Sequence, residues 1–185
     1  SGIKEQIIME LENELKEALA QSKALNAQVA QEYKERITEG KLTKDENPVS
    51  HFCAYFLPYN PITKQVLFGH HKKSGKWLSP GGHIDRSESL LETLNREIHE
   101  ELGVRSFFEK RPDPFLLTIT PIDRDPRKCR KHFDVWHLMK TDGKDFNIDM
   151  SEYYDIKWLS IPEARQITTD AANQAALDFL VETGL

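Results

Sequence analysis

The sequence predicts a mixed α/β domain that is built around one mixed β-sheet and is preceded by a helical extension. After residue 50, short segments rich in aromatic and apolar residues alternate with turn-forming Pro, Gly and Asn, as in strands connected by hairpins. A few segments among these strands instead repeat their apolar residues at helical spacing. Helices inserted among such strands indicate an α/β arrangement in which helices cover the sheet.

The length and composition are those of an ordinary soluble protein. A chain of 185 residues fits one domain and can bury a core, and no apolar run approaches the ~20 residues that span a bilayer. The net charge of -5 argues against general nucleic-acid binding. The two cysteines form no disulfide framework and the N-terminus lacks a signal-peptide pattern, so we expect a reducing, cytoplasmic location and no membrane partner.

Residues 1–45 form the expected helical extension. Residues 3–39 contain no Pro or Gly and are rich in helix-favouring residues, and Gly40 follows as a stop signal. A heptad-like seam runs along this segment through Ile8, Leu11, Leu15, Ala18, Ser22, Leu25 and Val29. Two interpretations stay open: one or two helices packed on the domain's own surface, or a helix that pairs two copies in a homodimer. Residues 40–50 are expected to be a linker.

The domain itself is expected over residues 50–185. Strands are predicted at 51–59 and 65–70, which form a hairpin, and at 114–122, 132–140 and 153–160. A short strand that starts at Trp77 is predicted to run into a Pro-Gly-Gly loop at 80–82. A helix is predicted to begin near residue 90, after a Pro-Gly-Gly loop. Two further helices are predicted at 161–167 and 170–182.

The helix near residue 90 has an unusual distribution of charge. Ser89 and Glu92 have the spacing of a capping box, and an apolar stripe follows at Leu90, Leu94, Ile98 and Leu102. At about 100° per residue, the carboxylates of Glu97, Glu100 and Glu101 share an arc that overlaps the edge of this stripe. Like charges held side by side at the margin of packed structure repel strongly, so a cation is expected there.

A hard divalent cation is the compensation that fits these acids best. Mg²⁺ takes oxygen ligands and commonly joins carboxylates to substrate phosphates, and Mn²⁺ is a suitable substitute. Glycines at Gly81 and Gly82 would let the backbone approach the same ion and offer it a carbonyl oxygen. Arg96 points further round the helix and can reach back towards Glu88, so we expect it to orient the acids.

The stretch from Gly82 to Val104 resembles the Nudix box, Gly-x5-Glu-x7-Arg-Glu-U-x-Glu-Glu-x-Gly-U, in which U is an aliphatic residue. Every specified position is met, with Glu88, Arg96, Glu97, Glu100, Glu101 and Gly103 at the invariant places and Ile98 and Val104 at the aliphatic ones. The "WLSPGG" segment that leads into the box and the later "IKWLSIPEA" segment (156–164) are also similar to the layout of the family. The resemblance therefore covers about residues 50–180 and leaves residues 1–45 outside it.

The resemblance implies a Nudix fold, an α/β/α sandwich, and hydrolysis of a nucleoside diphosphate linked to another moiety. It assigns the metal ions to Glu97, Glu100 and Glu101, and a further ligand to the carbonyl of Gly82 or Gly81. The position of Glu88 is a supporting or additional ligand, and that of Arg96 orients the glutamates.

The acid cluster and this resemblance together predict a Mg²⁺-dependent diphosphohydrolase. Bound Mg²⁺ would neutralise the diphosphate oxygens and activate a water molecule, and a carboxylate would act as the general base. A small nucleotide is the favoured substrate because the domain has no obvious large recognition insert. The alternative is a non-catalytic module that binds nucleotide or RNA, although proteins of that kind typically lack some of the box acids.

Several other residues have both a functional and a structural interpretation. The basic loop, with Arg127, Lys128 and Arg130, is either solvated or in contact with a substrate phosphate. His83 is close enough to the acid loop in sequence to contact a phosphate, although a surface histidine is the simpler interpretation. No paired Cys/His spacing points to zinc.

Four aromatic residues and the two cysteines are also considered for a role. Base stacking is conceivable for Phe52, Tyr55, Phe133 or Trp136, but alternation along a strand does not say which face borders the cleft. Cys53 is expected to be a small buried residue. Cys129, in the basic loop, is expected to be an exposed thiol with a lowered pKa.

Overall fold

The structure, a computed structural model, describes residues 2–123 and 129–185. Its helices are α1 (Gly2–Gln21), α2 (Ala27–Glu39), α3 (Leu90–Leu102), α4 (Ile161–Ile167) and α5 (Ala171–Thr183), with a 3-10 helix η1 at Met150–Glu152. Its strands are β1 (Lys23–Ala24), β2 (Ser50–Asn60), β3 (Gln65–His71), β4 (Trp77–Leu78), β5 (Gly81–His83), β6 (Leu116–Pro121), β7 (Lys131–Lys140) and β8 (Tyr153–Ser160).

The strands and helices expected after residue 50 are confirmed, with one change at the Pro-Gly-Gly segment. Gly81 and Gly82, expected in a loop, open the short strand β5. Within the described residues, eight strands form one mixed sheet with the order β1-β6-β7-β2-β3-β4. Strand β5 pairs with β2, and β8 pairs with β3. The longest pairing is the parallel one between β2 and β7, which runs from Ser50 and Lys131 to Tyr59 and Lys140.

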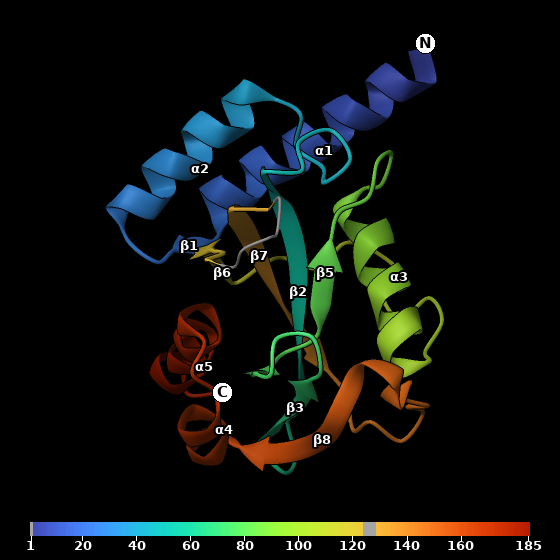
Figure 1. Cartoon of the computed structure of the whole chain (residues 1–185), viewed down its shortest axis with the longest axis vertical. Helices are drawn as coiled ribbons and strands as arrows, with labels where there is room; N and C mark the ends of the chain where they lie inside the picture. Colours follow the sequence, from blue (N-terminus) through green and yellow to red (C-terminus); the bar gives the residue numbers. More distant parts are fainter. Residues whose placement is uncertain (1, 124–128) are drawn as a thin grey trace.

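Helices cover both faces of this sheet, as the predicted α/β/α sandwich requires (Figure 1). Side chains alternate along β2, so Phe52 and Phe56 join the core beneath α1, α2 and α3. Leu57 and Tyr59 face the other way and pack with residues of α4 and α5. Two cores of this kind on one sheet explain why no residue of β2 is exposed.

The N-terminal extension is two helices, because the chain turns between Ser22 and Asn26. The Asn26 side chain accepts a hydrogen bond from the backbone N–H of Val29 and caps α2. A continuous heptad seam is therefore wrong: Leu25, one of its members, is exposed. Members on either side of the turn, among them Leu15 and Val29, are buried against the domain.

The extension is tied to the sheet by polar contacts as well. The hydroxyl of Tyr33, which is fully buried, donates to the carbonyl oxygens of Thr118 (3.1 Å) and Asp134 (2.5 Å). Residues 40–50, expected to be a linker, also pack against the domain, because Leu42 is buried and its carbonyl accepts from the N–H of Phe52. Homodimer formation through this extension stays a prediction.

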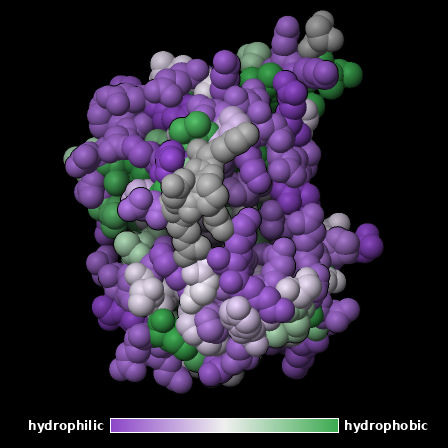
Figure 2. Space-filling view, viewed as in Figure 1, coloured by the Kyte–Doolittle hydropathy of each residue, from purple (hydrophilic) through white to green (hydrophobic). Residues whose placement is uncertain are grey.

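Some apolar surface remains at the free end of α1. Ile3, Ile8 and Met9 are exposed, and Figure 2 shows hydrophobic residues gathered there on an otherwise mainly hydrophilic face. None of the described helices is both long and apolar enough to span a membrane.

Candidate active site

Helix α3 holds the predicted acids on a rigid, capped element. Ser89 is the N-cap, with its side chain accepting from the N–H of Glu92, and Gly103 ends the helix in the left-handed conformation. The predicted stripe is confirmed, since Leu90, Leu94, Ile98 and Leu102 are all buried. The orientation of α3 about its own axis is therefore determined by this apolar face.

The acids differ in how deeply they lie beside strand β5. The Glu97 side chain is 12% exposed, whereas that of Glu100 is 56% exposed. The Glu101 carboxylate accepts hydrogen bonds from the N–H of Gly81 (3.1 Å) and the hydroxyl of Tyr153 (2.9 Å). Glu97 and Glu101 are thus enclosed by protein, while Glu100 reaches solvent.

Gly82 lies directly against Glu97. A Cβ atom at position 82 would collide with the Glu97 carboxylate, so any side chain at this position would have to displace that carboxylate. At Gly81, whose φ is +153°, a Cβ atom would meet Tyr55 and the backbone of Ala54. The two glycines therefore let β5 pass between strand β2 and the acids of α3.

Arg96 connects the acids of the helix with the loop before it. Its Nε and Nη2 atoms donate to both oxygens of Glu88, at 2.7 and 2.9 Å. Its Nη1 atom donates to Glu97 at 2.8 Å, and Nη2 also donates to the carbonyl oxygen of His83 at 2.9 Å. This fork places the Glu97 carboxylate and the end of β5 in one hydrogen-bonded unit.

Burial opposes ionisation of the two enclosed acids. Burial is the largest cause that raises the pKa of Glu97, with Arg96 acting in the opposite direction. Burial and then the charge of Glu97 raise the pKa of Glu101 well above its ordinary value. Burial also disfavours ionised Glu88, but hydrogen bonds from Arg96 and from the N–H of Asp85 outweigh it and lower the Glu88 pKa. A dication beside Glu97 and Glu101 would reverse their shifts, and their oxygen donors suit Mg²⁺.

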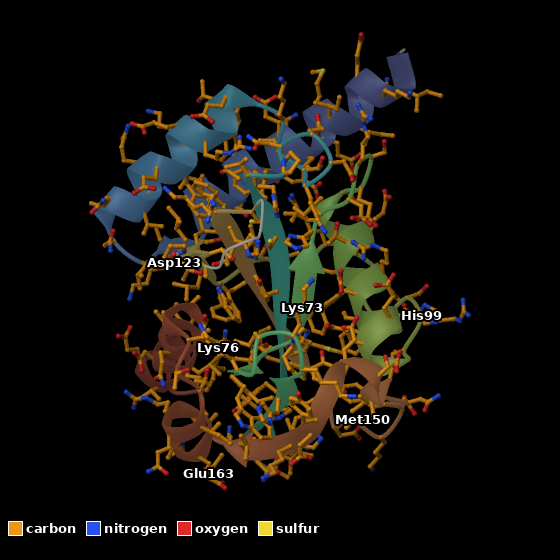
Figure 3. All side chains as sticks on the ribbon, viewed as in Figure 1. Lys73, Lys76, His99, Asp123, Met150 and Glu163 are labelled. Atoms are coloured by element: carbon orange, nitrogen blue, oxygen red, sulfur yellow. The ribbon has the colours of Figure 1, made fainter. Side chains whose placement is uncertain are left out.

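A cavity of about 860 Å³ opens beside these acids. Glu97, Glu100 and Glu101 line it together with Gly81 and Gly82. Its other lining residues include Lys44, Lys73, Lys76, Tyr55, Trp136 and Asp134. Figure 3 shows Lys73 and Lys76 in front of the centre of the sheet, on the segment that joins β3 to β4. The lysines supply positive charge to a cavity whose other side is acidic.

An aromatic pair and a buried acid form another part of the cavity wall. Tyr55 and Trp136 are stacked, with ring centroids 5.0 Å apart and planes 22° from parallel. Phe52 and Phe133 instead pack with Tyr33 in the core, so the register of β2 and β7 decides which of the four aromatic candidates border the cavity.

Asp134 was missed in the sequence. Its Oδ2 atom accepts from the hydroxyls of Thr118 (2.9 Å) and Thr120 (2.5 Å). Its Oδ1 atom has no hydrogen-bond partner among the residues that the structure describes, and burial raises the pKa of this carboxyl to about 7. A lone acid in the apolar strand segment "HFDVWHL" is the signal that could have identified it.

The basic residues of the predicted substrate loop are only partly described. Arg127 and Lys128 lie outside the described residues. Arg130 is exposed, and its backbone N–H donates to the carbonyl of Val49. Arg130 is not among the residues that line the cavity, so a substrate contact by this loop stays a prediction.

His83 and Cys129 differ from the simpler expectations for them. His83 lies in β5 and not in an open loop, and its Nδ1 atom is 2.8 Å from Nε2 of His51. Burial and the neighbouring His132 and His51 lower the pKa of His83 to about 2. Cys129 is half-buried, with its sulfur 3.8 Å from Nε2 of His51. Cys53 is buried, as predicted.

Comparison with known sequences relates most of the chain to one family. A family model described as the NUDIX domain matches residues 51–179. The chain is 26% identical over 113 residues to an RNA pyrophosphohydrolase of Francisella tularensis subsp. mediasiatica, an alignment that covers 52% of this chain and 69% of that relative. It is 27% identical over 103 residues to a probable DHNTP pyrophosphohydrolase of Lactococcus lactis subsp. cremoris, with coverages of 54% and 60%. It is 28% identical over 104 residues to the asymmetrical bis(5'-nucleosyl)-tetraphosphatase of Mus musculus, with coverages of 55% and 67%.

Solved structures share the fold. The MutT NUDIX hydrolase from Burkholderia pseudomallei superposes with a TM-score of 0.58 at 18% identity, over 71% of this chain and 98% of that one. The E. coli dihydroneopterin triphosphate pyrophosphohydrolase superposes with a TM-score of 0.55 at 20% identity, over 71% and 95%. At these identities the superpositions describe the fold alone.

Proposed function

The chain belongs to the Nudix family of pyrophosphohydrolases, and on that premise we propose that it is a Mg²⁺-dependent hydrolase of the diphosphate linkage in a nucleoside diphosphate joined to another moiety. The observation that carries the proposal is the pair of enclosed acids, Glu97 and Glu101, at the wall of a cavity that also presents lysines and a stacked aromatic pair. Ionised acids enclosed in this way are unfavourable unless a cation binds between them. A substrate diphosphate would supply the remaining oxygen ligands of that cation.

In this proposal the residues of the site have distinct roles. Glu97, Glu101 and the more exposed Glu100 hold the metal ion, with the Gly82 carbonyl as a further ligand. When bound, Mg²⁺ neutralises diphosphate oxygens and lowers the pKa of a coordinated water, and Mn²⁺ can replace it. Arg96 keeps the Glu97 carboxylate in place and is itself held by Glu88. One of the carboxylates removes a proton from the attacking water.

The substrate is proposed to be a small nucleotide. Tyr55 and Trp136 offer apolar surface to a base, and the orphan oxygen of Asp134 can accept from an exocyclic amino group when it is ionised. Lys73 and Lys76 line the same cavity and can meet phosphate oxygens. The relatives include an RNA pyrophosphohydrolase as well as a bis(5'-nucleosyl)-tetraphosphatase, so a 5' end of RNA belongs in the substrate panel.

Substituting Glu101→Gln tests the enzyme directly. Gln keeps the size of the side chain but removes the charge that a metal ion needs, so we expect turnover of a nucleotide panel with Mg²⁺ to fall at least about 100-fold. Glu92→Gln is the matched control, because Glu92 is an exposed acid of the same helix. If Glu101→Gln stays within a few-fold of the wild type, the proposed metal role is wrong.

The same substrate panel distinguishes the enzyme from the alternative, a non-catalytic module that binds nucleotide or RNA. Such a module would retain nucleotides with Mg²⁺ without releasing any phosphate product. A reducing, cytoplasmic location also stays a prediction.

A further inference from the structure

Four potential metal ligands lie close together on strands beside the acids. They are His51 and Cys53 on β2, His83 on β5 and His132 on β7, and one donor atom from each lies within 4.8 Å of all the others. His51 and Cys53 are buried, and His83 and His132 are half-buried. In the part of the chain that the structure describes, this is the one group of three or more His, Cys, Asp or Glu donors that converges so closely.

Strand pairing brings these residues together. In the parallel pairing of β2 with β7, His51 lies opposite His132. In the antiparallel pairing of β2 with β5, Cys53 lies opposite His83. Because His51 and Cys53 are two residues apart on one strand, their side chains lie on the same face of the sheet. The group is therefore fixed by backbone hydrogen bonds and does not depend on a mobile loop.

The donor atoms are close to the spacing of a tetrahedral site. His51 Nε2 is 2.8 Å from His83 Nδ1, and the Cys53 sulfur is 3.3 Å from the same nitrogen. The three imidazole rings have centroid separations of 4.6, 5.0 and 4.8 Å. Zn–N bonds of about 2.0–2.1 Å in a tetrahedron place two nitrogens about 3.3 Å apart, so the His51–His83 pair would open by about half an ångström. Donors as far as 4.8 Å apart would close by up to about 1.5 Å to admit the ion.

His51 is already oriented as a ligand would be. Its Nδ1 atom is 3.0 Å from the carbonyl oxygen of Asn47. A carbonyl only accepts, so Nδ1 carries the proton and donates, and the lone pair of Nε2 points into the cluster. An outer hydrogen bond from the second ring nitrogen to a backbone carbonyl is the usual support of a metal-binding histidine.

We propose that His51, Cys53, His83 and His132 bind one Zn²⁺ ion in a tetrahedral site with three nitrogens and one sulfur. The nitrogen and sulfur donors favour zinc over the oxygen-seeking Mg²⁺ that the glutamates suit. On binding, the Cys53 thiol loses its proton to solvent and the sulfur forms the bond to the metal. This site goes beyond the proposed hydrolase reaction and does not depend on it.

The zinc ion would join β5 to β2 and β7. Strand β5 also carries Gly81 and Gly82, and the carbonyl oxygen of His83 accepts from Arg96. The ion would therefore strengthen the wall against which the Glu97 carboxylate lies. Its role is structural, because all four of its ligands come from the protein.

Cobalt binding to the metal-free full-length chain tests this proposal without measuring turnover. Co²⁺ occupies tetrahedral zinc sites and absorbs visibly, and a cysteine ligand adds a thiolate-to-cobalt charge-transfer band. We expect one equivalent of Co²⁺ with both features, displaced by Zn²⁺. Cys53→Ser should abolish the charge-transfer band, and His132→Gln should lower the affinity at least about tenfold.

Three variants serve as controls for the assignment. His99→Gln changes a histidine on the outer side of α3 (Figure 3), Cys129→Ser removes the other cysteine, and Glu97→Gln alters the proposed magnesium site. All three should keep the cobalt spectrum. Circular dichroism confirms that each variant is folded, and a Cys53→Ser chain that does not fold leaves the wild-type band and His132→Gln to decide.

Two results would overturn the zinc site. One is a wild-type protein that binds Co²⁺ without a thiolate band or only with the weak absorption of oxygen ligands. The other is a band that survives Cys53→Ser in a folded chain or that disappears in Cys129→Ser.

Discussion

Gly82 is packed directly against a proposed metal ligand. A Cβ atom there would collide with the carboxylate of Glu97, the acid that Arg96 holds at 2.8 Å. Because α3 is fixed by its buried stripe, the helix cannot move away from β5 without disturbing the core. A methyl group at position 82 would therefore displace the Glu97 side chain first.

We expect Gly82→Ala to lower turnover at least about tenfold and to raise the Mg²⁺ concentration needed for half-maximal activity, since a metal ligand is moved. Activity titrations with Mg²⁺ measure both effects. In a Glu97→Gln background, Gly82→Ala should lower turnover only slightly further, because the metal ligand is already lost. Full, additive losses in the double variant would contradict this explanation.

His137 makes the stability of the fold depend on pH. It is fully buried on β7, and its Nδ1 atom donates to the carbonyl of Tyr55. Burial lowers the pKa of His137 from 6.5 to about 4. Above about pH 6.5 the ring is neutral in both the folded and the unfolded state, and its contribution to the unfolding free energy is complete. As the pH falls from 6.5 to 4, only the unfolded chain gains the proton, so the folded state is progressively disfavoured.

From this residue the wild type should lose about 3 kcal/mol of unfolding free energy between pH 7.5 and pH 4. His137→Gln has no titrating group there and keeps an N–H donor for the Tyr55 carbonyl. We therefore compare the unfolding free energies of the wild type and of this variant, measured with urea. The value for the wild type minus that for the variant should fall by about 3 kcal/mol between pH 7.5 and pH 4. Parallel pH profiles for the two proteins would disprove the role of His137.

At the scale of elements, α1 is part of the domain core and not an appendage. Leu15 is 1% exposed and lies in the same cluster as Phe52 of β2 and Leu94 of α3. The Glu14 side chain of α1 also accepts from the N–H of Leu90, at the start of α3. Helix α1 thus contacts both the sheet and the helix that carries the acids.

Leu15→Ala should destabilise the whole domain by about 2–5 kcal/mol, because it leaves a cavity in this core. Met9→Ala, on the same helix but 60% exposed, should change stability by less than about 0.5 kcal/mol. Urea unfolding followed by tryptophan fluorescence reports on the sheet, which carries Trp136 and Trp158. An unchanged transition for Leu15→Ala would mean that the extension folds separately.

At the scale of the whole molecule, the free end of α1 offers the surface on which a homodimer would depend. Ile3, Ile8 and Met9 are exposed there, while the opposite face of the helix is buried in the domain. On the homodimer hypothesis, substituting both Ile8→Glu and Met9→Glu should convert a dimer into monomers, because charges replace the apolar contact. Sedimentation velocity over a range of concentrations measures this.

Ile62→Glu is the matched control, since Ile62 is 87% exposed in the β2–β3 turn, distant from α1 in sequence. It should leave the sedimentation coefficient unchanged. A wild-type chain that sediments as a monomer at every concentration would show that the homodimer prediction is wrong.

Much of the fold and of the acid site was predictable from the sequence because the signals are local. Ser89, the four-residue repeat from Leu90 to Leu102 and Gly103 specify a capped helix and its buried face. The same spacing puts Glu97 and Glu101 one turn apart. The turn at Ser22–Asn26 was harder, because helix propensity extends across it and only the Asn26 cap interrupts the pattern.

What the amino-acid sequence determined by itself was most of the elements after residue 50, the α/β class and the acid-bearing helix, since each depends on residues within a few turns of one another. Only the tertiary structure decided that Tyr55 and Trp136 border the cavity, that Asp134 lies beside them, and that three histidines and a cysteine of β2, β5 and β7 converge. Those groupings depend on the registers of β2 with β7 and of β2 with β5, which join residues far apart in the chain. Backbone hydrogen bonds between strands determine such pairings, and a sequence read in order contains no spacing that reveals them.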